Sequence, residues 1–463
     1  MILLSLSFGI SWVLGAALAL ADGRRPTAGW LAVAGMGASL VCVGLLTARV
    51  LTEGPVWTVA GGWPPGVGIT LRADALGAVF ALVSTGVVFL ALVHEVLAGV
   101  RSRTFPALVL LLNAGLCGVF LTGDIFNFYV FFEIAMTAAY ALTGYREQDY
   151  QIRAAFIFAV VNLIGSVIFL IAVAGMYHLT GSLDMETVAR RMAGAEPAST
   201  AVISVAVFVA FGLKLGLFPF HFWLPAVYVG SHPPVAAILS GALANIGSYG
   251  LLRFGGEILP GFSGLGALVL LALGSASILY GALQAVSRRL PAEVMAYSAI
   301  GQAGYILIAI GVGGTVGYAA ATLYSLTNAL NKGLLFTATG LRGPWVGASF
   351  AVGAFSVAGV PPAAGFLGKL ALFRAALEAG GVFWSTVLTS LVFAGGALSF
   401  VYCFQVYQRA YMVPDDAKPD GAAQRALLAV LAGLVLLLGL WPEPLAAASS
   451  AAASALPAGG GIP

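Results

Sequence analysis

Long apolar runs constrain this chain more than any other feature of its sequence. Fourteen windows are each about as long as a helix must be to cross a bilayer, roughly 20 residues. Backbone inside a membrane has to satisfy its own hydrogen bonds, so windows of this kind predict helices rather than open strands. The predicted spans are 2–21, 29–50, 75–99, 105–122, 125–143, 154–177, 200–217, 234–253, 263–286, 292–312, 315–340, 349–379, 382–408 and 423–441.

Composition supports the same fold class. Of 463 residues, 60% are hydrophobic and only 8% are charged, with a mean hydropathy of +1.00. Soluble domains carry about 25% charged residues. The sequence therefore predicts an all-α polytopic membrane protein of about fourteen transmembrane helices.

Proline interrupts two of the predicted spans. A break at Pro219 follows Lys214, and a break at Pro361 precedes Lys369. Broken helices in corresponding positions of two halves point to an inverted repeat with an ion site near the membrane midplane. We therefore predict two inverted five-helix repeats, each with its own broken helix. The predicted divisions are 1–104 (spans 1–3 with an outer hairpin), 105–253 (spans 4–8), 263–408 (spans 9–13) and 409–463 (span 14 and the tail).

Two connections are longer than a turn. Residues 52–74 contain Gly-Gly and Pro-Pro and end in the alternating stretch ITLRAD, which predicts a small hairpin on the outer face. Residues 181–197 predict a short amphipathic surface helix capped near Ser182.

Basic residues are distributed unevenly between the two sets of loops, twelve after odd-numbered spans against six after even-numbered ones. The positive-inside rule then places the odd loops in the cytoplasm and both termini outside, for a multi-pass protein of the cell (inner) membrane. The twelve are Arg24, Arg25, Arg101, Arg103, Arg146, Arg153, Arg288, Arg289, Arg342, Arg409, Lys418 and Arg425.

Three of the four lysines lie inside apolar segments. They are Lys214, Lys332 and Lys369, whereas Lys418 falls in a polar loop. A lysine costs about 2.5–3.5 kcal/mol at the centre of an inserted helix, so it is expected there only in a polar interior. Lysine can give up its proton on burial, whereas arginine stays charged. The three buried lysines therefore predict a path for protons.

One carboxylate lies at membrane depth. Glu133 is nine residues beyond Asp124, or about 13 Å along a helix. Lys214 is its nearest candidate partner, and a Glu133–Lys214 pair that opens and closes would switch the charge on the lysine. The alternative is a static buried ion pair. Glu95, beside His94 at the end of the third span, is assigned instead to the membrane interface.

Four more polar residues are candidates for proton transfer. His221 follows the first break and His232 precedes Pro233, where a histidine can load protons at neutral pH. The alternative for both is a capping or loop role. Asn245 and Asn328 can hold water between lysines, or serve as ordinary hydrogen-bond donors between helices.

Four stretches together resemble one known family. TGDIFNFYVFFE, FGLKLGLFPFHFWLP, NALNKGLLF and AGVPPAAGFLGK occur in this order. They are similar to the antiporter-like subunits shared by respiratory complex I, membrane-bound hydrogenases and Mrp-type cation/proton antiporters. The first and last, with GGWPPGVGITLRAD, look most like the D subunits of Mrp-type Na⁺/H⁺ antiporters. The resemblance covers about residues 60–445. It implies a fourteen-helix inverted-repeat fold and matches Glu133, Lys214, Lys332 and Lys369 to the ionisable residues of the family.

The chain departs from the family pattern at three places. The eighth span reads GALANIGSYGLLR, with Asn245 where the family usually has lysine or histidine. Asn328 stands where a histidine is common, four residues before Lys332. The entry to the tenth span reads SRRLPAEVMAYS, with Pro291 and Glu293 inserted. Asparagine carries no proton, so these changes favour a specialised or partly silenced copy.

The resemblance implies a proton-translocating subunit of a multisubunit cation (Na⁺)/proton antiporter. Its expected partners are other antiporter-like and small hydrophobic subunits, protons, Na⁺ and lipid. One alternative is the proton-pumping subunit of a complex I-like quinone reductase or a membrane-bound hydrogenase, and another is a structural subunit that conducts weakly. We expect no resident cofactor or metal, because the three cysteines show no metal-binding spacing and no nucleotide-binding motif is present. The net charge of +3 is spread over many loops and does not predict nucleic-acid binding.

Overall fold

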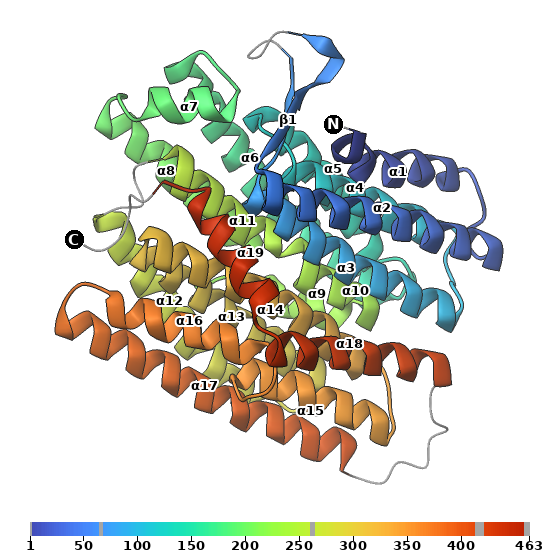
Figure 1. Cartoon of the computed structure of the whole chain (residues 1–463). Helices are drawn as coiled ribbons and strands as arrows, with labels where there is room; N and C mark the ends of the chain where they lie inside the picture. The colour runs from blue at the N-terminus through green and yellow to red at the C-terminus, as the bar shows by residue number, and fades with distance from the viewer. Residues whose placement is uncertain (1, 64–67, 260–263, 413–420, 458–463) are drawn as a thin grey trace.

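The structure is a computed structural model that describes residues 2–63, 68–259, 264–412 and 421–457. Long helices dominate it, and they run side by side in one broad bundle (Figure 1). The first half contains α1 Ile2–Ala19, α2 Pro26–Glu53, β1 Val56–Val59, η1 Ala60–Gly62, β2 Thr70–Ala73, α3 Ala75–Ala98, α4 Phe105–Phe120, α5 Ile125–Thr143, α6 Asp149–Thr180, α7 Met185–Met192, α8 Pro197–Leu215, α9 Leu224–Gly230, α10 Pro233–Ile238, η2 Leu239–Leu243, α11 Asn245–Arg253 and η3 Phe254–Ile258. The second half contains α12 Leu265–Ser287, α13 Pro291–Val312, α14 Gly314–Thr339, α15 Pro344–Ala358, α16 Gly365–Glu378, α17 Gly381–Tyr411, α18 Ala422–Leu440 and α19 Glu443–Ser454.

The all-α membrane fold is confirmed. Each predicted span overlaps helix in the described residues, with span 349–379 interrupted between α15 and α16, and eleven of the described helical segments are long and apolar enough to cross a membrane. The helices α4 and α15 are apolar but shorter. The total of fourteen spans and the two inverted repeats remain predictions. The helix α19 was not predicted, because its Ala- and Ser-rich sequence gives no strong apolar signal.

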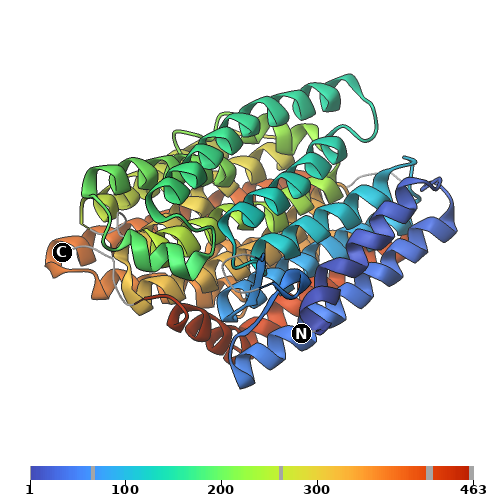
Figure 2. The same cartoon turned by 90° about the horizontal axis from the view of Figure 1, so that it is seen from above.

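Small residues set the closest helix contacts. A Cβ atom on Gly274 would approach the Gly304 carbonyl oxygen to 2.8 Å, and one on Gly281 would approach the Tyr297 carbonyl oxygen to the same distance. The helices α12 and α13 therefore pack backbone to backbone, as membrane helices do at small-residue seams. The helices α1 and α2 lie at one edge of the bundle in both views (Figures 1 and 2).

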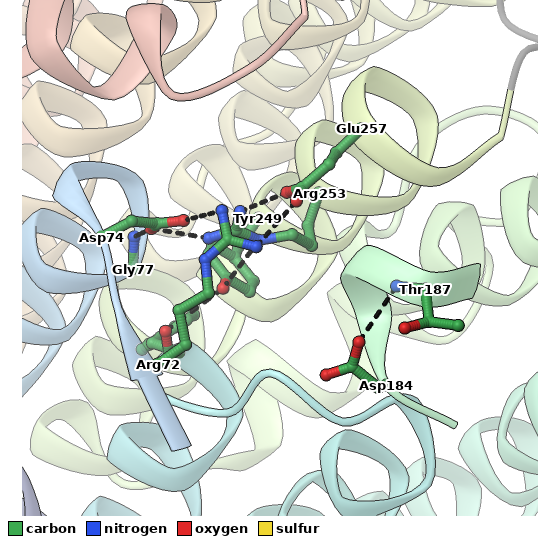
Figure 3. Close-up of polar contacts among 9 residues, drawn as sticks. Arg72, Asp74, Gly77, Asp184, Thr187, Tyr249, Arg253 and Glu257 are labelled. Carbon is green, nitrogen blue, oxygen red and sulfur yellow. Dashed lines mark hydrogen bonds and ion pairs between the residues drawn. The ribbon is translucent and has the colours of Figure 1, made fainter. Parts of the chain in front are cut away.

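The two long connections fold nearly as predicted. Strands β1 and β2 pair antiparallel with Val56 opposite Ala73, which confirms the hairpin, although residues 64–67 lie outside the described part of the chain. The surface helix is α7, but its cap is Asp184 rather than Ser182: the Asp184 carboxylate accepts from the Thr187 amide at 3.0 Å (Figure 3). A carboxylate also complements the helix dipole, which explains why it takes the capping position. Lys418 lies outside the described residues.

A buried ionic clamp holds the hairpin to the bundle (Figure 3). Arg253 of α11 contacts Asp74 at 2.7 Å and Glu257 at 2.5 Å. Arg72 of β2 contacts the same two carboxylates at 2.9 and 2.8 Å. Arg253 also donates to the Tyr249 hydroxyl at 3.1 Å. Two arginines and two carboxylates balance their charges, so this burial does not leave a net charge in the interior.

Asp74 stays ionised within this clamp. Burial alone would raise its pKa, but the adjacent Arg253 and Arg72 guanidinium groups and the hydrogen bond from the Gly77 amide lower the pKa to about 2. A carboxylate with this pKa holds no proton near neutral pH. Asp74 is therefore a structural ion and not a proton carrier.

Candidate functional site

The first helix break places Lys214 in the interior. The residue lies in the last turn of α8, with 6% of its surface exposed. Its ammonium donates to the Asn162 carbonyl at 3.0 Å and to the Ser166 hydroxyl at 3.2 Å, and it lies 4.2 Å from the centroid of the Phe132 ring. The helix ends immediately afterwards at Gly216, whose φ of +68° suits glycine. The break therefore fixes where this lysine enters the bundle.

Glu133 lies on α5, the helix that also presents Phe132 to Lys214. The carboxylate is close enough to act on Lys214 electrostatically, but no ion pair within 4.0 Å joins them in the described part of the chain. The Glu133 Oε1 atom is buried without a hydrogen-bond partner, and so is the Tyr140 hydroxyl on the same helix. In this structure the two groups of the predicted pair lie beyond ion-pair distance of each other.

A small cavity of about 10 Å³ adjoins the ammonium of Lys214. It lies between α5, α6 and α8 on one side and α11 with its preceding segment on the other, and Asn162, Tyr228 and Leu243 are among its lining residues. This is about the smallest volume that holds one water molecule. The cavity extends from Lys214 towards the segment that contains Asn245.

The second break places Lys369 in the interior in a similar way. Helix α15 ends at Gly359, with a φ of +81°, and α16 begins at Gly365. The Lys369 ammonium donates to the Ala358 carbonyl at 3.1 Å and lies 5.2 Å from the centroid of the Tyr305 ring. Only 4% of the residue is exposed, so it is not a snorkelling lysine.

Lys332 lies on the continuous helix α14 between the two breaks. It is 7% exposed, and its ammonium makes no hydrogen bond or ion pair with any residue that the structure describes. The side-chain oxygens of Asn328 and Asn331 are buried without partners. A Cβ atom on Gly241 would approach the Ala329 carbonyl oxygen to 2.7 Å, so η2 lies directly against α14 in this region.

Asn245 follows the π-helical segment η2. Its amide donates to the Ser84 hydroxyl of α3 at 3.0 Å and to the Gly241 carbonyl at 3.1 Å. The observed contacts are those of an interhelical hydrogen bond. Neither of these contacts reaches a lysine, and the predicted water bridge at Asn245 remains a prediction. Asn328 likewise remains a candidate only.

The two histidines have different surroundings. His221 lies in the turn between α8 and α9, its ring 4.4 Å from the Tyr280 centroid, and its Nδ1 is buried without a partner. His232 precedes α10, and its Nδ1 lies 3.4 Å from a Glu95 carboxylate oxygen and 3.4 Å from the Tyr145 hydroxyl. A role for either histidine in proton entry remains a prediction.

Glu95, at the end of α3, is buried by protein rather than exposed, and its assignment to the membrane interface remains a prediction. The residue is fully buried, and one carboxylate oxygen accepts from the Tyr145 hydroxyl at 2.5 Å and from the Arg146 guanidinium at 3.0 Å. These partners come from the turn after α5, far away in sequence. Burial costs little here because Arg146 provides the opposite charge. Only the tertiary packing of that turn against α3 reveals this group.

A ladder of polar side chains joins three helices near Lys369. Ser298 and Gln302 of α13 both contact the hydroxyl of Tyr402 on α17, at 2.7 and 3.3 Å. Tyr324 of α14 donates to the Gln302 side-chain oxygen. These groups join three helices, which is the ordinary interhelical role of polar side chains in membranes. Tyr402 gave no signal in the sequence, because an isolated tyrosine in an apolar span is unremarkable.

The family model described as NADH:quinone oxidoreductase/Mrp antiporter, transmembrane, matches residues 122–394, and so includes both breaks and all three buried lysines. The chain belongs to this family. It is 30% identical to the D subunit of the Na⁺/H⁺ antiporter of Alkalihalophilus pseudofirmus over 412 residues, covering 83% of each chain. It is 33% identical to the N subunit of the NADH-quinone oxidoreductase of Desulforudis audaxviator over 401 residues, covering 79% of this chain and 77% of that one.

Solved structures agree with the family assignment. A chain of the Mrp complex from Dietzia sp. DQ12-45-1b superposes with a TM-score of 0.90 at 26% identity, and the match covers 98% of each chain. The resemblance of this family member to the D subunits of Mrp-type antiporters is thereby confirmed. It is an antiporter-like membrane protein whose structural neighbour belongs to a multisubunit assembly.

Proposed function

We propose that this antiporter-like chain translocates protons within a multisubunit Na⁺/H⁺ antiporter. The protons move along the buried groups Glu133, Lys214, Lys332 and Lys369, with Asn245 and water bridging the gap left by the missing lysine of the eighth span. Support for Na⁺ as the coupled cation comes from the related Na⁺/H⁺ antiporter chain of Alkalihalophilus pseudofirmus.

One observation carries the proposal. Three lysines are each more than nine-tenths buried, and none has a carboxylate within ion-pair distance among the described residues. A permanent structural cation would need such a partner, as Arg253 has in the ionic clamp. Lysine can exist without its charge, whereas arginine cannot. The absence of a carboxylate partner therefore favours a role in which these lysines release and rebind a proton.

The open Glu133–Lys214 pair supplies the gate. When Glu133 approaches, it stabilises the ammonium. When it withdraws, Lys214 retains only the neutral Asn162 and Ser166 oxygens and passes its proton on. Charge changes in a low-dielectric interior act strongly on neighbouring groups. The lack of an ion pair within 4.0 Å between these two described residues supports the existence of a withdrawn state.

The test is proton flux in everted vesicles that contain the assembled complex. Lys214→Arg keeps a positive charge but removes the ability to release a proton, and Glu133→Gln removes the gating charge. We expect both to lose Na⁺-driven proton movement. Glu443→Gln, on the exposed first turn of α19, is the matched control and should retain it. Unchanged flux in both relay variants would instead favour a structural subunit, the hypothesis that Asn245 and Asn328 motivate.

A second candidate is the proton-pumping subunit of a complex I-like enzyme or a membrane-bound hydrogenase. The 33% identity to a chain of an NADH-quinone oxidoreductase favours it. Mass spectrometry of the complex purified through this chain separates the two. If the chain belongs to an antiporter, we expect only small hydrophobic and antiporter-like partners. Copurifying iron–sulfur, flavin or nickel proteins would show that the chain is a subunit of a redox enzyme.

A further inference from the structure

A cavity of about 460 Å³ opens where three helix connections meet, and four arginines line it. Arg24 comes from the α1–α2 connection, Arg101 and Arg103 from the α3–α4 connection, and Arg146 from the α5–α6 turn. We call this site the arginine basin. Its volume falls within the usual range of small-molecule sites. Glu147 is the one acidic residue among those that line it, so the lining carries an excess of three positive charges.

Two of the four arginines already have acidic partners. Arg24 contacts Asp22 through two hydrogen bonds of 3.0 Å, and these bonds lower the pKa of Asp22 to about 2. Arg146 contacts the buried Glu95 below the basin at 3.0 Å. Both guanidinium groups are thus anchored in place and do not need a further anion for their own stability.

Arg101 and Arg103 differ from them. Both are exposed, and their side chains make no hydrogen bond or ion pair with the residues that the structure describes. Arg101 lies near enough to His232, and Arg103 to Asp22, to act on them electrostatically. Two unpaired guanidinium groups therefore line the same basin as two anchored ones.

The remaining lining groups suit a tetrahedral oxyanion. The hydroxyls of Ser102 and Thr104 lie 3.3 Å apart at the rim. Helix α4 begins at Phe105, immediately after these two residues. Arginine forks bind phosphate oxygens in pairs, which distinguishes phosphate from a halide or a neutral polar group.

We propose that the arginine basin binds a phosphate-bearing anion, supplied either by the headgroup of an anionic phospholipid or as free phosphate. Helices α1 and α2, whose connection supplies Arg24, lie at the edge of the bundle, the side from which a lipid headgroup would approach (Figure 2). Basic pockets between helix ends are the usual sites for anionic headgroups. This binding site is independent of proton transfer along the lysines.

The test uses the full chain in its assembled complex, purified in detergent and stripped of lipid. Native mass spectrometry counts bound phosphatidylglycerol against phosphatidylcholine, and calorimetric titration measures inorganic phosphate against chloride at equal ionic strength. The variant is Arg101→Gln/Arg103→Gln. Arg153→Gln/Arg190→Gln is the matched control, because both of these arginines are exposed and lie outside the basin.

Each arginine near an anionic headgroup contributes about a fivefold gain in affinity, so removing both should weaken binding about 25-fold. Glu147→Gln removes the opposing charge and should strengthen binding about fivefold. If the basin variant loses only phosphatidylglycerol binding, the basin is a headgroup site. If it loses binding of inorganic phosphate, the basin is a site for free phosphate. If the basin variant binds both probes as well as the control does, or if phosphatidylcholine binds equally well, the proposal is wrong.

Discussion

The ionic clamp makes a quantitative prediction about stability. Asp74→Asn keeps the size of the side chain and removes the charge that faces Arg253 and Arg72, 2.7 and 2.9 Å away. Lowering the pKa of Asp74 from 3.8 to about 2 means that the folded protein favours the carboxylate by about 2 kcal/mol. Because the folded pKa is the lower one, this stability is fully present above pH 4 and is lost as the pH falls towards 2.

The substitution costs more than this difference, because Arg253 stays buried with one partner fewer. Breaking a buried ion pair from one side costs about 3–5 kcal/mol. We therefore expect Asp74→Asn to lower the thermal midpoint of the detergent-solubilised protein at pH 7 by about 3–5 °C. Removing Arg253 as well should recover part of the loss, since no unpaired charge then remains.

A matched control separates burial from charge. Asp22 also has a pKa of about 2, set by Arg24, but it belongs to an exposed ion pair. Such pairs contribute little to stability, so Asp22→Asn should leave the midpoint unchanged. Fluorescence-detected size exclusion after a heating series measures both variants. Equal losses for the two variants, or no loss for Asp74→Asn, would refute the reasoning.

Three further predictions concern the helix breaks. Gly216→Ala places a side chain on a left-handed backbone conformation and should destabilise the fold by about 1–2 kcal/mol. Gly9→Ala is the control, because Gly9 has open space around it, and it should leave the thermal midpoint unchanged. Lys369→Arg should leave assembly intact and abolish proton flux in vesicles, because arginine does not release its proton; retained flux would remove this lysine from the relay. Gly396→Ala places a methyl group 3.0 Å from the Lys369 ammonium and 3.3 Å from the Ala358 carbonyl oxygen, so it should slow flux without loss of protein, as measured by flux per unit of complex.

The sequence was sufficient for the features that depend on local order. Apolar windows predicted the helices, because a membrane span needs continuous apolar length whatever its neighbours are. Proline and glycine marked both breaks, since their effect on the backbone is local. The burial of Lys214 and Lys369 followed from their position inside these windows.

Features that depend on distant partners could not be predicted in this way. The ion pair of Glu95 could not be predicted, because its partner Arg146 lies 51 residues further along the chain. The clamp joins Arg72 to Glu257, 185 residues apart, and no local pattern connects them. Ser182 and Asp184 are both good capping residues, and the tertiary position of α7 decides between them.

The two π-helical segments on either side of α11 affect how the eighth span should be engineered. Each such turn holds more residues than an α-turn, and one extra residue rotates the following side chains by about 100°. Counting along this span at 3.6 residues per turn from α10 therefore misplaces the side chains of α11. Asn245→Lys, the obvious way to restore the family pattern, begins from a side chain that points at Ser84 on α3. A redesign that aims a cation at the neighbouring lysines has to adjust the winding of η2 together with residue 245.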